Sequence, residues 1–516
     1  MKFWLINICL IIGAFCNAQQ NTIPLHSFYK DQLFANKLSS PYNEGSFLPA
    51  NESDYDLISA INDSSKQYYT FTHILFKKHL VEIRARDAYI TISPTFNLSF
   101  ARDVADTSSG KLSQNTRGIH VEGDLFKNFS FSTSFYENQA FVSNYEYDYY
   151  HSNGERYLNL NGDYSVQNAV IPGAGRTKEF KDRGLDYAYA IGYFSYTPLK
   201  QLRISAGNNA QFIGDGYRSI LLSDNAYSAP YLRLDWKIHR KFRFTYFRSR
   251  HLNLLRKPVS SSVENYYDPK GFSVNYFTFK PTEHLNLSLF EGAMWNKADS
   301  LNTIPVHPMF YNPVPLISTL TLNGTGEAVC LLGLNIGWQP GKKHRVYAQA
   351  AINDLDVEKT GFQLGYRTYS FFNQPDAMLQ LEYNFVPNGM YESTNRRLNY
   401  SHYNLPLAHV KGSGFQEFVL RANYEYKRMY ADLTALLFLL DHHRRNAHLP
   451  LYETFDAVSG TTYFQDTELG YRFNRKMNLS LFIAHTYRSK DPFGGWSTNI
   501  FRAGVKTAIV NHYKDF

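Results

Sequence analysis

Cysteine is nearly absent from this sequence, which has 3 in its 516 residues. Two of them fall in the apolar stretch Met1–Ala18, which we predict to be a secretory signal because its apolar core is too short to span a membrane. Cleavage there leaves Cys330 alone, so the exported chain would have no internal disulfide. Its stability must come from another source, and a closed β-sheet would supply it.

Long apolar stretches are also missing. After the signal, no segment is long and apolar enough for a membrane helix, and the mean hydropathy is -0.39. A helical membrane protein is therefore excluded, but a transmembrane β-barrel is not, because its lumen face stays polar. The chain has few tryptophans, 5, but 40 tyrosines and 39 phenylalanines, which suits the aromatic girdles of such barrels.

A surplus of one charge sign is small, since the formal net charge is +8 and basic residues alternate with acidic ones along the chain. We therefore expect no nucleic-acid partner. Signals for catalysis are weak too. His442, His443 and His448 lie together, but no cysteine or carboxylate stands at a useful spacing for a metal, and Gly-x-Ser-x-Gly is absent. We expect no enzyme activity, catalytic residue, metal or cofactor.

What the sequence does contain, from Asp87 onward, is a series of segments in which apolar and polar residues alternate. This pattern predicts strands with one apolar and one polar face. We predict about eighteen strands, an even number within the range of single-chain bacterial barrels. They lie near Ala88–Ala101, Asn115–Phe126, Asn128–Gln139, Leu185–Thr197, Gln201–Asn209, Pro230–Ile238, Lys241–Arg248, Gly271–Lys280, His284–Gly292, Ala328–Trp338, Arg345–Asn353, Gly361–Ser370, Ala377–Pro387, Phe415–Lys427, Met429–Leu440, Phe464–Phe473, Met477–Arg488 and Ser497–Ile509.

The connections alternate in length. Those after even strands are short, such as Pro198–Lys200 and Pro281–Glu283, whereas most after odd strands are long. Outer-membrane barrels combine short periplasmic turns with long external loops. The sequence therefore predicts an all-β fold, a transmembrane antiparallel barrel, with Ala140–Gly184, Asn388–Gly414 and Asp441–Tyr463 outside the cell.

Basic residues fall on the predicted inner faces of several strands. Those expected to face the lumen are Arg203, Arg233, Lys237, Arg243 and Arg421. They would form either an anion-attracting surface for acidic polysaccharide or a network paired with acidic neighbours that only stiffens the barrel.

A connection within Gly207–Leu234 joins two of the predicted strands. It is long, rich in glycine, and mixes leucines with charges, so we expect a structured loop folded against the inside of the barrel. Aromatic rings and Arg, Asp and Asn side chains are the groups that bind sugars. The candidate glycan-binding or lumen-loop residues are Gly214, Asp215, Gly216, Tyr217, Arg218, Asp224, Asn225 and Tyr227. Alternatively, Arg218 would only pair with Asp224 within the loop.

The stretch Ile213–Ala226, followed by Pro230, resembles the signature loop of the Wzi-type capsule-assembly outer-membrane proteins. It resembles their gliding-motility-associated relatives in Bacteroidetes more closely still. Pro172–Arg176, leading into Asp186–Ala188, and Phe310–Val314 resemble the same group. The resemblance implies a barrel that holds acidic capsular or other surface polysaccharide, and it implies contact with surface-export or gliding-motility components.

The predicted organisation has three parts. Residues 1–18 form the signal, 19–87 form a periplasmic extension or plug, and 88–516 form the outer-membrane barrel in contact with lipid. Within the second part, Ser53–Ser65 is predicted to be a helix and His73–Ile83 a helix or a strand. We expect Pro308–Gly326 to be a second inward loop, which favours a surface-assembly role over the alternative, a passive porin for small solutes.

Overall fold

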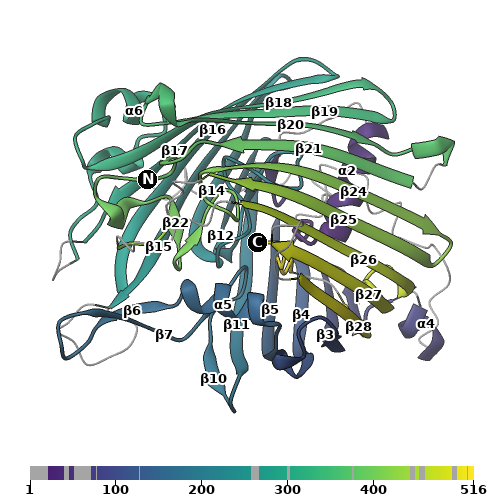
Figure 1. Ribbon diagram of the computed structural model, residues 1–516. Coiled ribbons are helices and arrows are strands. Elements are labelled where there is room, and N and C mark those ends of the chain that lie inside the picture. Colours follow the sequence, from purple (N-terminus) through teal and green to yellow (C-terminus); the bar gives the residue numbers. More distant parts are fainter. Residues whose placement is uncertain are drawn as a thin grey trace.

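The chain folds into a closed antiparallel β-barrel, shown as a computed structural model in Figure 1. The structure describes residues 21–39, 46–51, 71–76, 78–126, 128–256, 267–298, 303–374, 377–441, 448–451, 460–490, 497–507 and 510–516. No helix among these residues is long and apolar enough to cross a membrane.

Eighteen strands form the wall, and each pairs with its neighbour in sequence. They are β3 (Ala88–Asp103), β4 (Lys111–Leu125), β5 (Phe129–Phe141), β11 (Gly184–Leu199), β12 (Leu202–Asn209), β14 (Ala229–His239), β15 (Phe242–Arg256), β16 (Tyr267–Thr282), β17 (Leu285–Asn296), β18 (Ala328–Gly341), β19 (His344–Asn353), β20 (Thr360–Thr368), β21 (Ala377–Val386), β24 (Phe415–Tyr426), β25 (Met429–Leu440), β26 (Gly460–Asn474), β27 (Leu479–Lys490) and β28 (Ser497–Lys506). The last strand pairs with the first, with Arg502 opposite Ala101, and this closes the barrel.

The remaining elements are short. The helices are α2 (Ser27–Ser39), α4 (Phe71–Phe76), α5 (Asn144–Ser152) and α6 (Ile317–Leu322), with single turns η2 (Thr107–Ser109), η3 (Pro308–Tyr311), η4 (Val357–Lys359), η5 (Phe371–Asn373) and η6 (Arg396–Leu398). The other strands are β1 (Phe47–Leu48), β2 (Val81–Ala85), β6 (Glu155–Leu158), β7 (Tyr164–Gln167), β8 (Val170–Ile171), β9 (Gly175–Arg176), β10 (Lys178–Phe180), β13 (Phe212–Ile213), β22 (Ser401–His402) and β23 (Leu405–Pro406).

Alternation along the wall strands sorts their side chains as the sequence predicted. In β21, Gln380 and Asn384 are fully buried, whereas Leu381 between them is 44% exposed. Phe418 and Leu420 of the neighbouring strand are also exposed. A strand turns successive side chains to opposite faces, so the polar row faces the lumen and the apolar row faces outward. The predicted all-β class and strand number are confirmed.

The N-terminal region differs from its prediction in one place. The stretch His73–Ile83 is neither one helix nor one strand, because α4 ends at Phe76 and β2 begins at Val81. β2 extends the wall by pairing with the start of β3, with Ile83 opposite Ile90. The predicted signal and the predicted helix Ser53–Ser65 lie outside the described residues.

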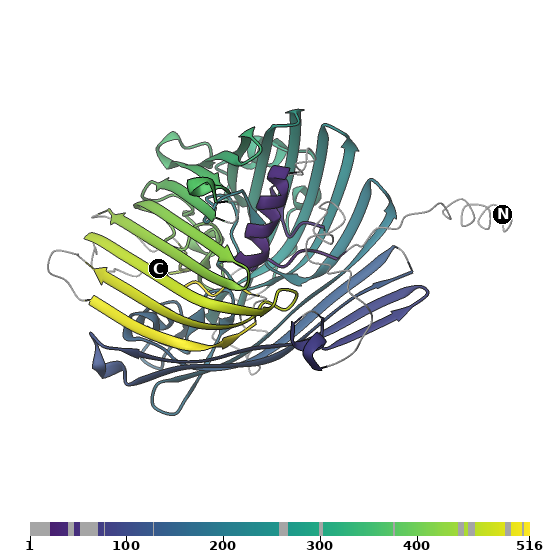
Figure 2. The ribbon, with the colours of Figure 1, turned by 90° about the vertical axis from the view of Figure 1, so that its right-hand side faces the viewer.

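Helix α2 lies inside the ring of strands, near the end where the turns are short, and Figure 2 shows it there. The Tyr29 hydroxyl donates to the carbonyl of Lys476 in a short turn at 2.8 Å. Asp31 forms an ion pair with Arg421 of the wall at 3.0 Å. These contacts fix α2 across the short-turn end of the lumen.

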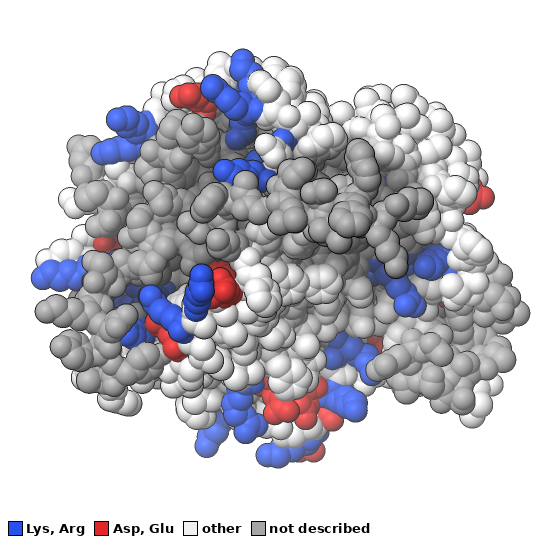
Figure 3. Space-filling model, turned by 180° about the vertical axis from the view of Figure 1, so that it is seen from behind, with Lys and Arg blue, Asp and Glu red and all other residues white. Residues whose placement is uncertain are grey.

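Two long connections lie elsewhere than expected. The β21–β24 connection, predicted to be external, enters the lumen and buries Tyr391, Leu398, Tyr400 and most of its other residues. Only its tip, near Thr394, is exposed. The stretch Pro308–Gly326 was predicted to turn inward, and this is wrong, because Phe310 and Leu322 pack with Trp295 on the outer face of the wall. On the face seen in Figure 3, acidic side chains lie among basic ones.

Candidate functional site

The candidate site is built around Gln211–Ser228, the connection between β12 and β14, which we call the lumen segment. It begins with β13, whose Ile213 pairs with Phe47 of β1 inside the barrel. Of the eight predicted site residues in the segment, all are buried except Tyr217 and Tyr227, which are half-buried. The segment is therefore an internal element of the barrel and not a solvated loop.

The first turn of the lumen segment depends on two glycines. Gly214 has φ of +125°, a backbone conformation that favours glycine. A Cβ at Gly216 would lie 2.6 Å from the Oε2 atom of Glu382. Between them, the Asp215 carboxylate accepts hydrogen bonds from the Ser46 hydroxyl at 2.9 Å and from the Arg345 Nε at 3.0 Å. The turn is thus held by the N-terminal region and the wall together.

Arg218 joins three separate parts of the chain. Its Nε lies 3.2 Å from Glu417 of β24, and its Nη2 lies 2.9 Å from the Asp515 carboxylate near the C-terminus. Its backbone amide donates to Glu382 of β21 at 3.1 Å. Burial disfavours the charged guanidinium, but Asp515 and Glu417 outweigh it and raise the pKa of Arg218 above its ordinary value. The predicted pairing with Asp224 is wrong, because the charges that satisfy Arg218 come from outside the segment.

The far end of the lumen segment is also bonded to the rest of the chain. Asp224 accepts from the Tyr513 hydroxyl at 2.6 Å and from the Asn511 amide at 2.9 Å. The Asn225 side-chain amide donates to the carbonyl of Pro406 at 3.2 Å. Tyr227 packs on the ring of Tyr403, with 4.9 Å between centroids. Arg218, Asp224 and Asn225 therefore hold the segment in place through contacts within the protein.

The C-terminal tail, residues 510–516, is a part of the site that the sequence prediction missed. The wall ends at Lys506, and the tail then returns through the lumen. Phe516 is 3% exposed and stacks on Tyr149 of α5 at 3.7 Å. A terminal aromatic often ends the last strand of a barrel, but here it is packed inside. The feature of the sequence that could have revealed the tail is the loss of strand alternation at His512 and Tyr513.

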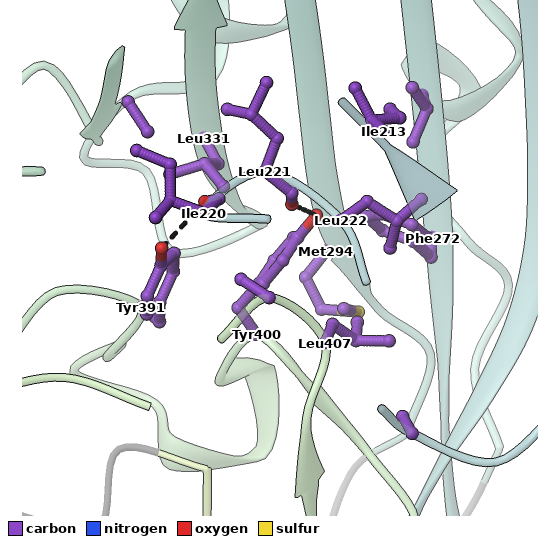
Figure 4. Close-up of a cluster of buried hydrophobic side chains, with 14 of the residues drawn as sticks. Ile213, Ile220, Leu221, Leu222, Phe272, Met294, Leu331, Tyr391, Tyr400 and Leu407 are labelled. Atoms are coloured by element: carbon purple, nitrogen blue, oxygen red, sulfur yellow. Dashed lines mark hydrogen bonds between the residues drawn. The ribbon is translucent and has the colours of Figure 1, made fainter. Parts of the chain in front are cut away.

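An apolar core supports the lumen segment from one side (Figure 4). Ile220, Leu221 and Leu222 pack against inward side chains of the wall that include Phe272 and Met294. Two hydroxyls complete the contact: Tyr391 donates to the carbonyl of Ile220, and Tyr400 to that of Leu221, both at 2.7 Å. The long-loop half of the lumen is thus packed like a protein interior.

The predicted lumen-facing basic residues have different surroundings. Arg233 pairs with Asp235 at 2.9 Å and also donates to the carbonyl of Phe47. Arg421 pairs with α2, as described above. Arg203 is 5% exposed and stands opposite Asp235 in the sheet register. Lys237 and Arg243 stand opposite one another.

A polar cavity of about 550 Å³ lies in the lumen on the side away from the apolar core. It is lined by α2, the tail, Tyr217, Arg421 and the inner faces of β24–β28, β3 and β4. Its walls carry ion pairs that join β28 to β26 across β27, such as Arg502 with Asp466 at 3.1 Å and Lys506 with Glu468 at 2.7 Å. On its α2 side, burial lowers the pKa of Lys30 to about 7.

The predicted histidine group can be followed only in part, because His442 and His443 lie outside the described residues. Across the part of the chain that the structure describes, no group of three or more His, Cys, Asp or Glu side chains is placed to hold a metal ion. Of the three histidines considered above, His448 is described, and its Nε2 lies 2.8 Å from the side-chain oxygen of Asn153.

Comparison with known proteins gives a fold and no family. No family model matches the chain, and no curated protein matches it. Among solved structures, Wzi of Escherichia coli, an outer-membrane protein involved in group 1 capsule assembly and a carbohydrate-binding β-barrel, is similar with a TM-score of 0.56. It is 10% identical, and the match covers 94% of this chain and 98% of Wzi.

Porin structures match less well. A BenF-like porin from Pseudomonas fluorescens has a TM-score of 0.43 and 10% identity, over 83% of this chain and 99% of the porin. OccAB2 of Acinetobacter baumannii has a TM-score of 0.41 and 9% identity, over 81% and 97%. Similarity at these levels does not indicate that the chain shares a function with the porins. The chain therefore has the fold of the Wzi barrel.

Proposed function

We propose that this protein is an outer-membrane barrel that acts in cell-surface assembly by holding acidic surface polysaccharide, and that it is not an enzyme. The observation that carries the proposal is the filled lumen. The lumen segment, the β21–β24 connection and the C-terminal tail occupy the long-loop half, joined by a buried ion network and an apolar core. A barrel built to pass solutes needs an open path, whereas a binding barrel does not.

The proposed contact residues for sugar are Tyr217 and Tyr227. Both are half-buried, and both lie on a segment whose other polar residues are fixed by the protein. Aromatic rings give sugars an apolar stacking face, and pre-ordered groups bind at a smaller entropic cost. In this proposal Arg218, Asp224 and Asn225 position the two rings. Contact with surface-export or gliding-motility components, which the resemblance implies, belongs to the same proposal.

Polysaccharide retention tests this role. A deletion strain carrying Tyr217→Ala, Tyr227→Ala should shed surface polysaccharide into the medium, while the protein reaches the membrane in normal amount with heat-modifiable gel mobility. Tyr164→Ala is the matched control, because Tyr164 is a 52% exposed tyrosine on the β6–β7 hairpin. Normal retention by the well-folded double variant would reject the assigned contacts.

A passive porin is the second candidate, and the polar cavity beside β24–β28 favours it. Purified protein in a planar bilayer separates the two. Under the binding proposal the intact barrel conducts poorly, and removal of residues 510–516 opens a path beside the cavity and raises the conductance. A large, steady conductance from the intact protein would favour the porin.

A further inference from the structure

The outer face of the wall carries a segment that we call the outer strap, Pro308–Leu322 in the connection between β17 and β18. It contains η3 and α6, and Figure 1 shows α6 beside β16–β18. Strand alternation places it outside. In β17, Phe290 and Met294 face the lumen core, so Ala293 and Trp295 face outward. Both pack with residues of the strap in a cluster separate from the lumen core.

The wall beneath the strap is unusual for a lipid-facing surface, because it carries charges. Arg248 and Glu291 stand on the outward rows of β15 and β17. An arginine exposed to lipid there would cost about 2–4 kcal/mol at the bilayer midplane, and a glutamate would cost less. Both are buried under the strap, at 6% and 2% exposure. In β17, sequence alternation alone could have revealed Glu291 as a charge on an otherwise apolar row.

These charges bond the backbone of the strap. The Arg248 guanidinium donates to the carbonyls of Phe310 at 2.5 Å and Asn312 at 2.6 Å. Glu291 accepts from the Thr319 amide at 3.0 Å and from its hydroxyl at 2.9 Å. Irregular backbone is tolerated at membrane depth only when its polar groups are satisfied by protein. The bonds thus make the strap compatible with lipid.

Apolar contacts complete the inner face of the strap. Phe310 and Leu322 pack with Trp295 and Cys330, which are both fully buried. The Trp295 indole donates to the Ser273 hydroxyl at 2.6 Å, so its polar atom is satisfied as well. The strap is therefore packed onto the wall as part of the folded structure.

The outer surface of the strap is apolar. Tyr311 is 63% exposed, Val314 48%, Ile317 37% and Leu320 70%. No Asp, Glu, Lys or Arg occurs between Thr303 and Gly326. A contiguous exposed apolar surface of this kind marks an interaction site, and this one continues the outward row of Leu285, Leu287 and Leu289.

The height of the uncovered apolar wall indicates that membrane lipid covers the strap. The uncovered apolar row of β17 runs from Leu285 to Leu289, about 14 Å at roughly 3.4 Å per residue. A strand tilt of about 45° reduces this to about 10 Å along the membrane normal, whereas the apolar band of such barrels is about 25 Å tall. On this side of the barrel, the apolar part of the wall that the strap leaves uncovered is too short to match the hydrocarbon core.

We infer that the outer strap completes the membrane-facing surface of the barrel, with Tyr311, Val314, Ile317 and Leu320 in contact with the acyl chains of the membrane. The inference rests on the proposed outer-membrane location. The strap replaces a stretch of bare wall, and Arg248 and Glu291 hold it there from behind.

Spin labels at single cysteines test the inference in a Cys330→Ala background, using the full protein in lipid vesicles. Leu320→Cys should collide with oxygen and be shielded from a water-soluble nickel chelate, as should Leu289→Cys in the bare wall. Leu160→Cys, on the fully exposed tip of the β6–β7 hairpin, should show the opposite pattern.

The labelling results distinguish the strap inference from the proposed membrane location. A label at position 320 that is open to the chelate, with position 289 shielded, would overturn the strap inference and leave the membrane location intact. Exposure of position 289 itself would overturn the location. Dipolar broadening between labels at position 320 would show that a second copy of the chain covers this surface, which also overturns contact with lipid.

Discussion

Arg218 shows how one side chain can organise a barrel interior. Its guanidinium and backbone amide connect the lumen segment to β21, β24 and the C-terminal tail through Glu382, Glu417 and Asp515. Charges removed from water are costly, so such a network is stable only when every member is paired. Since Arg218 and Glu417 are both buried, loss of the cation would remove the ion-pair partner that Glu417 and Asp515 share.

We therefore expect Arg218→Met to lower the free energy of unfolding by about 3–5 kcal/mol, the cost of breaking a buried pair from one side. Urea titration in detergent micelles, followed by heat-modifiable mobility, measures the change. Arg475→Ala is the control, because Arg475 pairs with Glu425 but its side chain is 53% exposed. The control should lose less than about 1 kcal/mol. Equal losses for the two variants would contradict the central role of Arg218.

At the scale of elements, the inward β21–β24 connection is held to the wall by a neutral histidine. His402 of β22 is 1% exposed, and its Nδ1 accepts from the backbone amide of Leu252 at 3.0 Å. Burial, together with the charge of Lys270, lowers the pKa of His402 to about 3. A protonated ring could not accept this bond, so the element depends on the neutral form.

This dependence predicts acid sensitivity with a defined direction. The unfolded chain binds a proton at His402 near pH 6.5, whereas the folded chain does not until about pH 3, so stability is complete above pH 6.5 and is lost as the pH falls below it. At pH 5 the loss from this group is about 2 kcal/mol. His402→Asn, which keeps an acceptor for Leu252, should reduce the difference in unfolding free energy between pH 7 and pH 5. An unchanged difference would show that His402 is not responsible.

The elements differ in how far the sequence predicts them. The wall strands follow from alternation and from short turns, because both depend on neighbours in the chain, and all eighteen match segments predicted to be strands. The connections depend on distant contacts. The glycine-rich turn located the lumen segment. No local pattern joins Asp515 to Arg218 or turns Pro308–Leu322 to the outside.

At the scale of the molecule, the two ends of the barrel differ. One end has short turns and holds α2, beside the polar cavity. The other has the long connections, and there the lumen segment, α5 and the tail close the interior. Sorting of connection length by end is typical of barrels inserted in one direction, with short turns in the periplasm and long loops outside.

The asymmetry predicts the result of cysteine labelling on intact cells. Asn161→Cys and Thr394→Cys lie at exposed positions of long connections and should react with a membrane-impermeant maleimide. Lys200→Cys and Glu283→Cys are also at exposed positions but lie at short turns, so they should react only after the cells are opened. The native Cys330 is fully buried under the outer strap and should not react in either condition.

Since all four labelled positions are exposed, accessibility of the side chain cannot explain a difference in labelling, and only the side of the membrane can. Reaction of Glu283→Cys on intact cells would show that the short turns face outward. It would contradict the proposal that the long-loop end meets polysaccharide outside the cell.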